Sequence, residues 1–171
     1  MTKRFLLAIV TVMVLASCSH SYYIVRHAEK EQPAGTATMA GTDPALSEAG
    51  KVRAIVLKEE LKSKHIRHIY STNTIRTKST AQPLSESVGV PIEIYNSTDS
   101  LVMELKKIKK GNVLVVGHSN TVDDIVNQLS GETKVAKDLA DSQYDNLFII
   151  KYKGKKITFT RHKYGYPSNP E

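Results

Sequence analysis

The chain has 171 residues, of which 40% are hydrophobic and 24% charged, and its formal net charge is +7. That length suits one domain with one core, and the composition is globular rather than disordered. The positive charge could suit a nucleic-acid binder, but the densest lysine group, at 106–110, contains no aromatic side chain on which a base could stack. We therefore expect no nucleic-acid partner and interpret this group as a solvated helix end.

The first 18 residues have the pattern of a bacterial lipoprotein leader. A positive start at Lys3 and Arg4 precedes an uncharged, mostly apolar run over 5–15, which is shorter than the ~20 residues of a membrane span. Cys18 follows Leu-Ala-Ser and resembles the lipobox cysteine, whose thiol is lipidated and becomes the new N-terminus. An ordinary signal peptide with an incidental cysteine is the alternative.

This pattern predicts a signal peptide over 1–17 and a lipidated tether over 18–21. The protein would be an exported lipoprotein, held by palmitate to the membrane on the periplasmic side of the cell envelope. Cys18 is the only cysteine, so no internal disulfide can form and the mature domain must be stabilised by its core.

Strand and helix patterns alternate through the rest of the chain. β-branched and apolar runs predict strands at 22–25, 68–71, 91–95 and 112–117 and a closing hairpin at 146–152 and 156–160. Helical spacing predicts helices after the N-cap Ser47, from Thr74 or Arg76 to Val88, over 101–108 and over 121–129. We expect a surface loop at 31–44, one domain over 22–163 and a frayed tail at 164–171. This order predicts an α/β, three-layer sandwich, with a mostly parallel central sheet and helices on both faces.

Three predicted strand ends carry reactive or phosphate-binding residue types. In parallel sheets, ligands bind beyond the carboxyl ends of the strands. Arg26-His27 follows the first strand, 71–76 follows the second, and Gly117-His118 follows the central one. Arginine matches phosphate oxygens bidentately, and a neutral histidine can attack phosphorus. The loop at 117–120 also leads into a helix N-terminus, which favours an anion. These residues predict a phosphoryl site.

Four segments resemble signatures of the histidine phosphatase superfamily, whose fold is phosphoglycerate-mutase-like. Residues 23–29 resemble its R-H-G/A-E signature, 46–50 its L-[ST]-x-x-G segment, 71–81 its S-x-x-x-x-R-[TA]-x-x-T-A segment, and 116–119 its second-histidine motif. The short chain lacks the long insertions of mutase members, and so is closest to the small phosphohistidine-phosphatase-like members. That argues against mutase activity.

The resemblance implies a role for each matching residue. His27 would be the nucleophile that carries a phosphohistidine intermediate. Glu29 would orient the site without touching substrate, and an ordinary surface carboxylate is the alternative. Phosphate binding falls to Arg26, Arg76, His118, Ser119 and Asn120. The family needs no metal and no cofactor, and the sequence contains no convincing metal-binding set.

The general acid is less clearly marked. A leaving alcohol needs a proton from a nearby acid. The G-x-x-E-G stretch that follows the catalytic Glu in many members is absent, and Asp99 stands about where the acid is expected. Glu93 and Glu104 are alternatives, and Asp99 could instead only cap a helix starting near Ser100. Without an acid, phosphohistidine or acyl phosphates become better substrates than sugar phosphates.

These features together predict a metal-independent phosphatase that hydrolyses a phosphomonoester or a phosphohistidine. Its partners would be a small phosphorylated substrate or a phosphoprotein, and the membrane through the N-terminal lipid. The alternative is a catalytically weak phosphate- or partner-binding module on the same fold.

Overall fold

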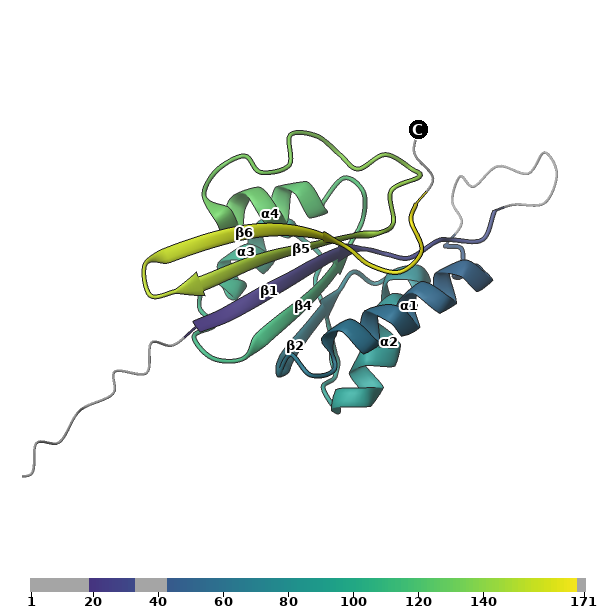
Figure 1. Cartoon of the computed structure of the whole chain (residues 1–171), viewed down its shortest axis with the longest axis horizontal. Coiled ribbons are helices and arrows are strands. Elements are labelled where there is room, and N and C mark those ends of the chain that lie inside the picture. Colours follow the sequence, from purple (N-terminus) through teal and green to yellow (C-terminus); the bar gives the residue numbers. More distant parts are fainter. Residues whose placement is uncertain (1–18, 33–42, 169–171) are drawn as a thin grey trace, which may run out of the picture.

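A computed structural model describes residues 19–32 and 43–168. A six-stranded sheet of order β3-β2-β4-β1-β5-β6 lies between two layers of helices (Figure 1). The strands are β1 (Ser19–Arg26), β2 (Ile66–Ser71), β3 (Ile92–Ile94), β4 (Asn112–Gly117), β5 (Asn146–Lys153) and β6 (Lys156–Lys163). The helices are α1 (Glu48–Leu61), α2 (Ile75–Val88), α3 (Thr98–Leu105) and α4 (Val122–Ser130). β1 to β4 pair in parallel, and β5 and β6 are antiparallel. The predicted three-layer sandwich is confirmed.

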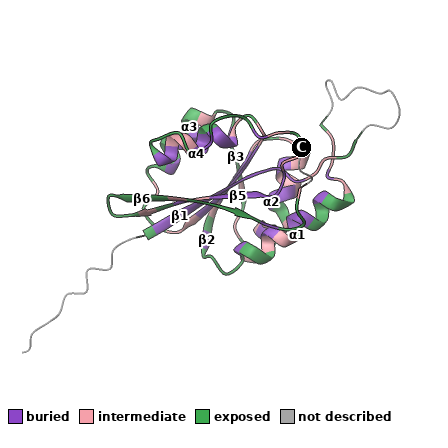
Figure 2. Ribbon diagram, turned by 45° about the horizontal axis from the view of Figure 1, so that its top comes forward, coloured by how far each residue is buried: buried purple, intermediate pink, exposed green. Residues whose placement is uncertain are grey.

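Strand β1 contributes side chains to the two large hydrophobic cores, one on each face of the sheet. It is buried from His20 to Arg26 (Figure 2). Successive strand side chains point to opposite faces of a sheet. Tyr22 and Ile24 accordingly pack in the cluster that contains α3 and α4 side chains, whereas Tyr23 and Val25 pack in the cluster that contains α1 and α2 side chains. This strand therefore fixes the position of its own carboxyl end between the two helical layers.

Strand β1 starts three residues earlier than predicted. Residues 19–21, expected as part of a tether, belong to the strand: Ser19 pairs with Lys153, and the N–H of Ser21 donates to Asn112 Oδ1 at 2.7 Å. The polar side chains of these residues give no strand signal in the sequence. They are ordered by contacts with β4 and β5 and not by intrinsic strand propensity. Cys18 and the signal peptide predicted over 1–17 lie outside the described residues.

The end of the chain is held by hydrogen bonds over residues 164–168, although 165–167 are exposed, which corrects the expectation of a frayed tail there. Tyr164 is buried, and Ser168 Oγ accepts hydrogen bonds from the N–H groups of Tyr144 and Asp145 at 2.9 and 3.0 Å. The Asp145 carboxylate in turn accepts from the N–H of Ser168 at 3.1 Å. These partners lie about twenty residues away in the sequence, so no local pattern reveals them. Residues 169–171 lie outside the described part.

The segment at 46–50 packs against the backbone that follows β1. Ser47 caps α1 as predicted, since its Oγ accepts from the N–H of Gly50 at 3.2 Å, and its own N–H donates to the Glu29 carbonyl at 3.0 Å. A Cβ atom on Gly50 would lie 2.1 Å from that carbonyl oxygen. Glycine at this position therefore allows α1 to approach the residues after His27.

We expect Gly50→Ala to destabilise the protein. Helix propensity alone would stabilise it by about 1 kcal/mol, but the clash with backbone should cost about 1–3 kcal/mol more than that gain. Urea unfolding measures the difference. Ala49→Gly on the neighbouring exposed position is the control, and should show only the propensity loss of about 1 kcal/mol. A stabilised Gly50→Ala protein would contradict the close approach.

Candidate active site

The carboxyl ends of β1, β4 and β2 lie side by side. Arg26 aligns with Gly117 and Ser71 with Val116, and the N–H of His27 donates to the Gly117 carbonyl at 2.9 Å. This register brings six residues predicted from the sequence to one open pocket of about 320 Å³, namely Arg26, His27, Arg76, His118, Ser119 and Asn120. Lys30 and Asp141, which the sequence did not mark, complete its lining.

His27 is held as a neutral ring with one nitrogen free. It is 4% exposed, and its Nδ1 lies 2.8 Å from the Ala28 carbonyl. A carbonyl only accepts, so Nδ1 carries the hydrogen and Nε2 keeps its lone pair. Burial, followed by the charges of Arg26 and Arg76, lowers the pKa of His27 to about 3 against the opposing Ala28 hydrogen bond. The ring is therefore neutral across the physiological pH range, and its Nε2 lone pair has the chemistry that a nucleophile requires.

His118 faces His27 across the pocket, with ring centroids 5.5 Å apart. Its Nε2 lies 2.8 Å from Thr72 Oγ1, and its Nδ1 lies 3.4 Å from a terminal nitrogen of Arg76. Burial and the charges of Arg76 and Arg26 lower its pKa to about 4. Since arginine only donates, Nδ1 is the acceptor here. A phosphoryl dianion would favour protonation of this ring and so turn Nδ1 into a donor.

Arg26 is positioned by the segment between α4 and β5. Its guanidinium carbon lies 4.3 Å from the ring centroid of Tyr144, and Nη1 donates to the Ala140 carbonyl at 2.7 Å. Nη2 donates to the Asp141 carboxylate at 3.1 Å, and that aspartate side chain is 90% exposed. A stacked arginine of this kind is oriented, yet its exposed carboxylate partner can be displaced by a more highly charged anion.

Arg76 has a similar arrangement at the start of α2. Thr74 caps this helix, as one of the two starts that the sequence allowed, and Arg76 Nη1 donates to Asp43 at 3.1 Å. The Nε atoms of both Arg26 and Arg76 are buried without an acceptor within the described ranges. Each guanidinium thus has donor capacity left for an anion.

Tyr144, Asp141, Asp43 and Lys30 were missed by sequence reasoning. Asp43 lies within the loop predicted at 31–44, Lys30 directly precedes that loop, and the other two lie in an irregular segment before β5. Side chains that enter a site from irregular segments carry no periodicity and match no motif. Only their contacts in three dimensions identify them.

Glu29 forms a buried ion pair outside the pocket. Its carboxylate lies 2.6 Å from Arg53, which is 4% exposed and also donates to the carbonyls of Tyr164 and Tyr166 at 2.7 and 2.9 Å. The pair ties the residues after β1 to α1 and to the C-terminal segment. Glu29 therefore does not line the pocket, and its contact with Arg53 holds the backbone that follows His27.

The three carboxylates weighed as the general acid do not line this pocket. Asp99 Oδ1 accepts a hydrogen bond from Gln128 at 2.9 Å, Glu93 lies 3.9 Å from His68, and Glu104 lines a separate groove. For Asp99 the reason is the position of α3, which begins at Thr98, three residues earlier than predicted, with Ser97 as its cap. Asp99 thus lies in the first turn of α3, directed toward α4 and not toward His27.

The pocket chemistry is that of anion binding beside a nucleophile. Two arginines supply fixed positive charge, and neutral histidines supply an attacking nitrogen and a second polar contact. Among residues 19–32 and 43–168, no group of three or more His, Cys, Asp or Glu side chains is arranged to hold a metal ion. No helix in those ranges is long and apolar enough to cross a membrane.

Comparison with known proteins finds a family match over part of the chain. The model of the histidine phosphatase superfamily (branch 1) matches residues 22–98, which include Arg26, His27 and Arg76 but end before His118. A protein named probable phosphoglycerate mutase, from Photorhabdus laumondii, is 33% identical over 70 residues, which is 41% of this chain and 33% of that protein. The matched segment therefore spans about a third of that relative. The resemblance predicted from the sequence is confirmed.

Solved structures share the fold at low identity. The protein histidine phosphatase SixA complexed with tungstate has a TM-score of 0.66 and 17% identity, over 84% of this chain and 96% of that one. A mycobacterial glucosyl-3-phosphoglycerate phosphatase has a TM-score of 0.61 and 12% identity, over 85% and 98%. A phosphoglycerate mutase from Bacillus anthracis has a TM-score of 0.61 and 17% identity, over 84% and 92%.

The lowered pKa of His27 predicts a loss of stability in acid. Above pH 6.5 the His27 ring is neutral in both the folded and the unfolded protein. As the pH falls from 6.5 toward 3, the ring becomes protonated in the unfolded chain but stays neutral in the folded protein, which favours unfolding. The free energy of unfolding should fall by on the order of 2 kcal/mol at pH 5 from this group. Urea unfolding at pH 7 and pH 5 measures it.

His27→Gln should weaken the pH dependence by that amount, whereas His162→Gln, at an exposed position, should not. An unchanged dependence in His27→Gln would refute the assignment.

Proposed function

We propose that this chain, matched to the histidine phosphatase superfamily over residues 22–98, is a phosphatase that works through a phosphohistidine on His27. One observation carries the proposal: a buried, neutral His27 with a free Nε2 lies beside Arg26, Arg76 and His118 in one open pocket. Transfer of a phosphoryl group needs positioning and charge stabilisation, and this set supplies both.

The reaction has two steps. In the first, His27 Nε2 bonds to phosphorus as the bond to the leaving group breaks, and the leaving group takes a proton from solvent. In the second, a water oxygen attacks phosphorus, the N–P bond breaks, and neutral His27 and inorganic phosphate are released. Arg26 and Arg76 hold the phosphoryl oxygens throughout, in exchange for Asp141 and Asp43.

The positions of the nearby carboxylates indicate the substrate class, because a leaving alcohol needs a proton donor. Asp99, Glu93 and Glu104 are directed elsewhere, and Asp141 and Asp43 contact the two arginines and not His27. With no positioned proton donor among them, an alcohol would leave poorly, whereas the imidazole of a phosphohistidine takes up a proton near neutral pH. We therefore propose a phosphohistidine or another phosphoramidate as substrate, and the likeness to the fold of a protein histidine phosphatase agrees with this choice.

Phosphate release tests this proposal. The protein without its first 18 residues should hydrolyse a phosphohistidine peptide and para-nitrophenyl phosphate faster than an alkyl phosphate. His27→Ala should lower each rate by at least about a thousandfold, because the covalent nucleophile is lost. Asp99→Ala should leave the rates within about twofold of the parent, since its carboxylate contacts Gln128 on the surface.

A histidine outside the pocket serves as the matched control. His68→Ala should keep full activity, because His68 stacks on Tyr70 away from the site. Activity that survives in His27→Ala would reject the mechanism. Phosphate binding without turnover in the parent protein would favour the phosphate-binding module instead. A large loss in Asp99→Ala would restore that residue as the acid.

We also propose that the chain is exported and anchored by lipid at Cys18. The support is the leader pattern at 1–17 and the lipobox-like sequence that ends at this cysteine. Cells that express the chain in labelled palmitate should yield a labelled protein, and Cys18→Ala should yield an unlabelled one. Ser17→Ala, which keeps the thiol and a small residue before it, is the control and should stay labelled. Absence of label in the parent chain would refute the anchor.

A further inference from the structure

The end of the sheet opposite the pocket is rich in lysine. Strands β1, β2 and β4 begin there, and the β5–β6 hairpin turns there. The connections at this end and the residues that flank them contribute nine exposed lysines, of which Lys62 is paired with Glu59. The other eight, which we call the basic end, are Lys64, Lys106, Lys107, Lys109, Lys110, Lys153, Lys155 and Lys156. They come from three connections that are far apart in the sequence.

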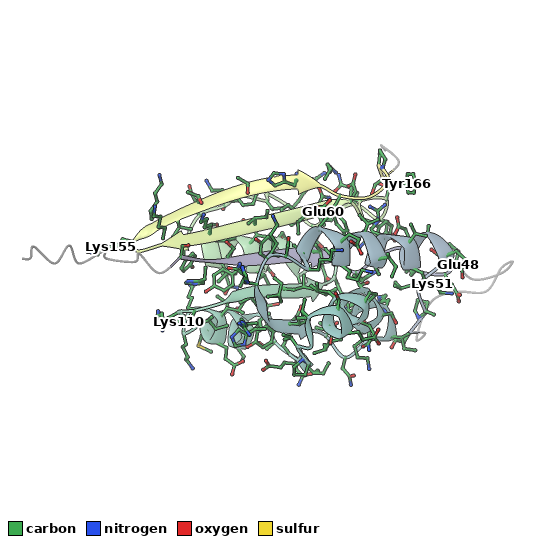
Figure 3. The ribbon with its side chains drawn as sticks, turned by 60° about the horizontal axis from the view of Figure 1, so that its bottom comes forward. Glu48, Lys51, Glu60, Lys110, Lys155 and Tyr166 are labelled. Atoms are coloured by element: carbon green, nitrogen blue, oxygen red, sulfur yellow. The ribbon has the colours of Figure 1, made fainter. Side chains whose placement is uncertain are left out.

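Contacts place these connections around the first residues of β1. Ser19 pairs with Lys153, which pairs in turn with Lys156 across the hairpin. On the other side, the N–H of Ser21 donates to Asn112, which lies two residues after Lys110 in the chain. Figure 3 shows Lys110 and Lys155 at one end of the molecule, and Glu48, Lys51 and Tyr166 at the other.

The charge of the basic end is not neutralised within the protein. None of its eight lysines forms an ion pair with another described residue. The nearby Glu59 is already paired with Lys58 and Lys62, and Glu104 lies in the groove beside Ile94. The charge of Lys109 also contributes, after burial, to the lowered pKa of His20 in β1. Like charges gathered on one surface repel one another, so this arrangement favours an anionic partner.

We propose that the basic end docks on the anionic surface of the membrane that holds the lipid anchor, an inference that rests on the proposed lipidation of Cys18. Ser19 is already in β1, so the domain has almost no tether and must lie against the lipid headgroups. Each lysine near an anionic surface strengthens binding about fivefold. A polybasic surface adds electrostatic attraction to the hold of a lipid anchor and so orients the domain on an anionic membrane.

Docking by the basic end orients the active site away from the membrane. β1 has eight residues and runs from the basic end to the pocket, a distance of roughly 26 Å at about 3.3 Å per residue. The pocket then opens toward the aqueous side. Its substrate would be a soluble phosphorylated molecule or protein, and not a headgroup phosphate of the same bilayer.

Lysine reactivity in vesicles tests this orientation. The purified lipidated chain is reconstituted in phosphatidylcholine alone, or in equal parts phosphatidylcholine and phosphatidylglycerol, and treated with an amine-acetylating reagent. Lys107, Lys109 and Lys156 should be acetylated about fivefold more slowly on the anionic vesicles than on phosphatidylcholine alone. Lys51, at the other end, should react equally on both. About 1 M salt, where the screening length is ~3 Å, should abolish the difference.

Matched charge reversals isolate the basic end. Lys110→Glu with Lys155→Glu should remove the protection of the other lysines there, whereas Lys51→Glu with Lys78→Glu, the same charge change elsewhere, should not. Equal reactivity on both kinds of vesicle, with the protein still floating with them, would overturn the docking surface alone. A chain that floats with neither kind would instead overturn the lipid anchor.

Discussion

The parallel register of β1 with β4 is the constraint on which the rest of the structure depends. The hydrogen bond from the N–H of His27 to the Gly117 carbonyl extends that register one residue beyond β1. It places His27 beside the loop that carries His118. Because β1 packs on both helical layers, neither residue can move without disturbing a core. The Glu29–Arg53 pair and the close approach of Gly50 hold the following residues in the same way.

The electrostatics of the pocket are arranged to receive an anion. Burial and two arginines keep both histidines neutral, so the proposed nucleophile, His27, would need no accompanying base. Burying the Arg26 guanidinium would be costly, and stacking on Tyr144 together with carbonyl and carboxylate acceptors offsets that cost. A phosphoryl group can take the place of the exposed carboxylate of Asp141.

The strand direction also gives the molecule two chemically different ends. At the carboxyl ends of the parallel strands, fixed arginines are paired with acidic side chains around the pocket. At the amino ends, lysines collect without such partners around Ser19. The same topology that assembles the catalytic residues thus separates them from the lysines by the length of β1. In the proposed docking, this separation leaves the pocket facing water while the basic end faces the membrane.

The alternation of elements, the cap at Ser47 and the grouping of arginines and histidines could all be predicted from the sequence. Each depends on local rules: propensity, capping, and the convergence of ligands at the carboxyl ends of parallel strands. The sequence could not place Asp99, because a three-residue shift in the start of α3 turns that carboxylate away. Only the tertiary structure decided the strand at 19–21, the packing of 164–168 and the roles of Tyr144 and Asp141. Contacts between residues distant in sequence order these features, and such contacts leave no periodic or local pattern.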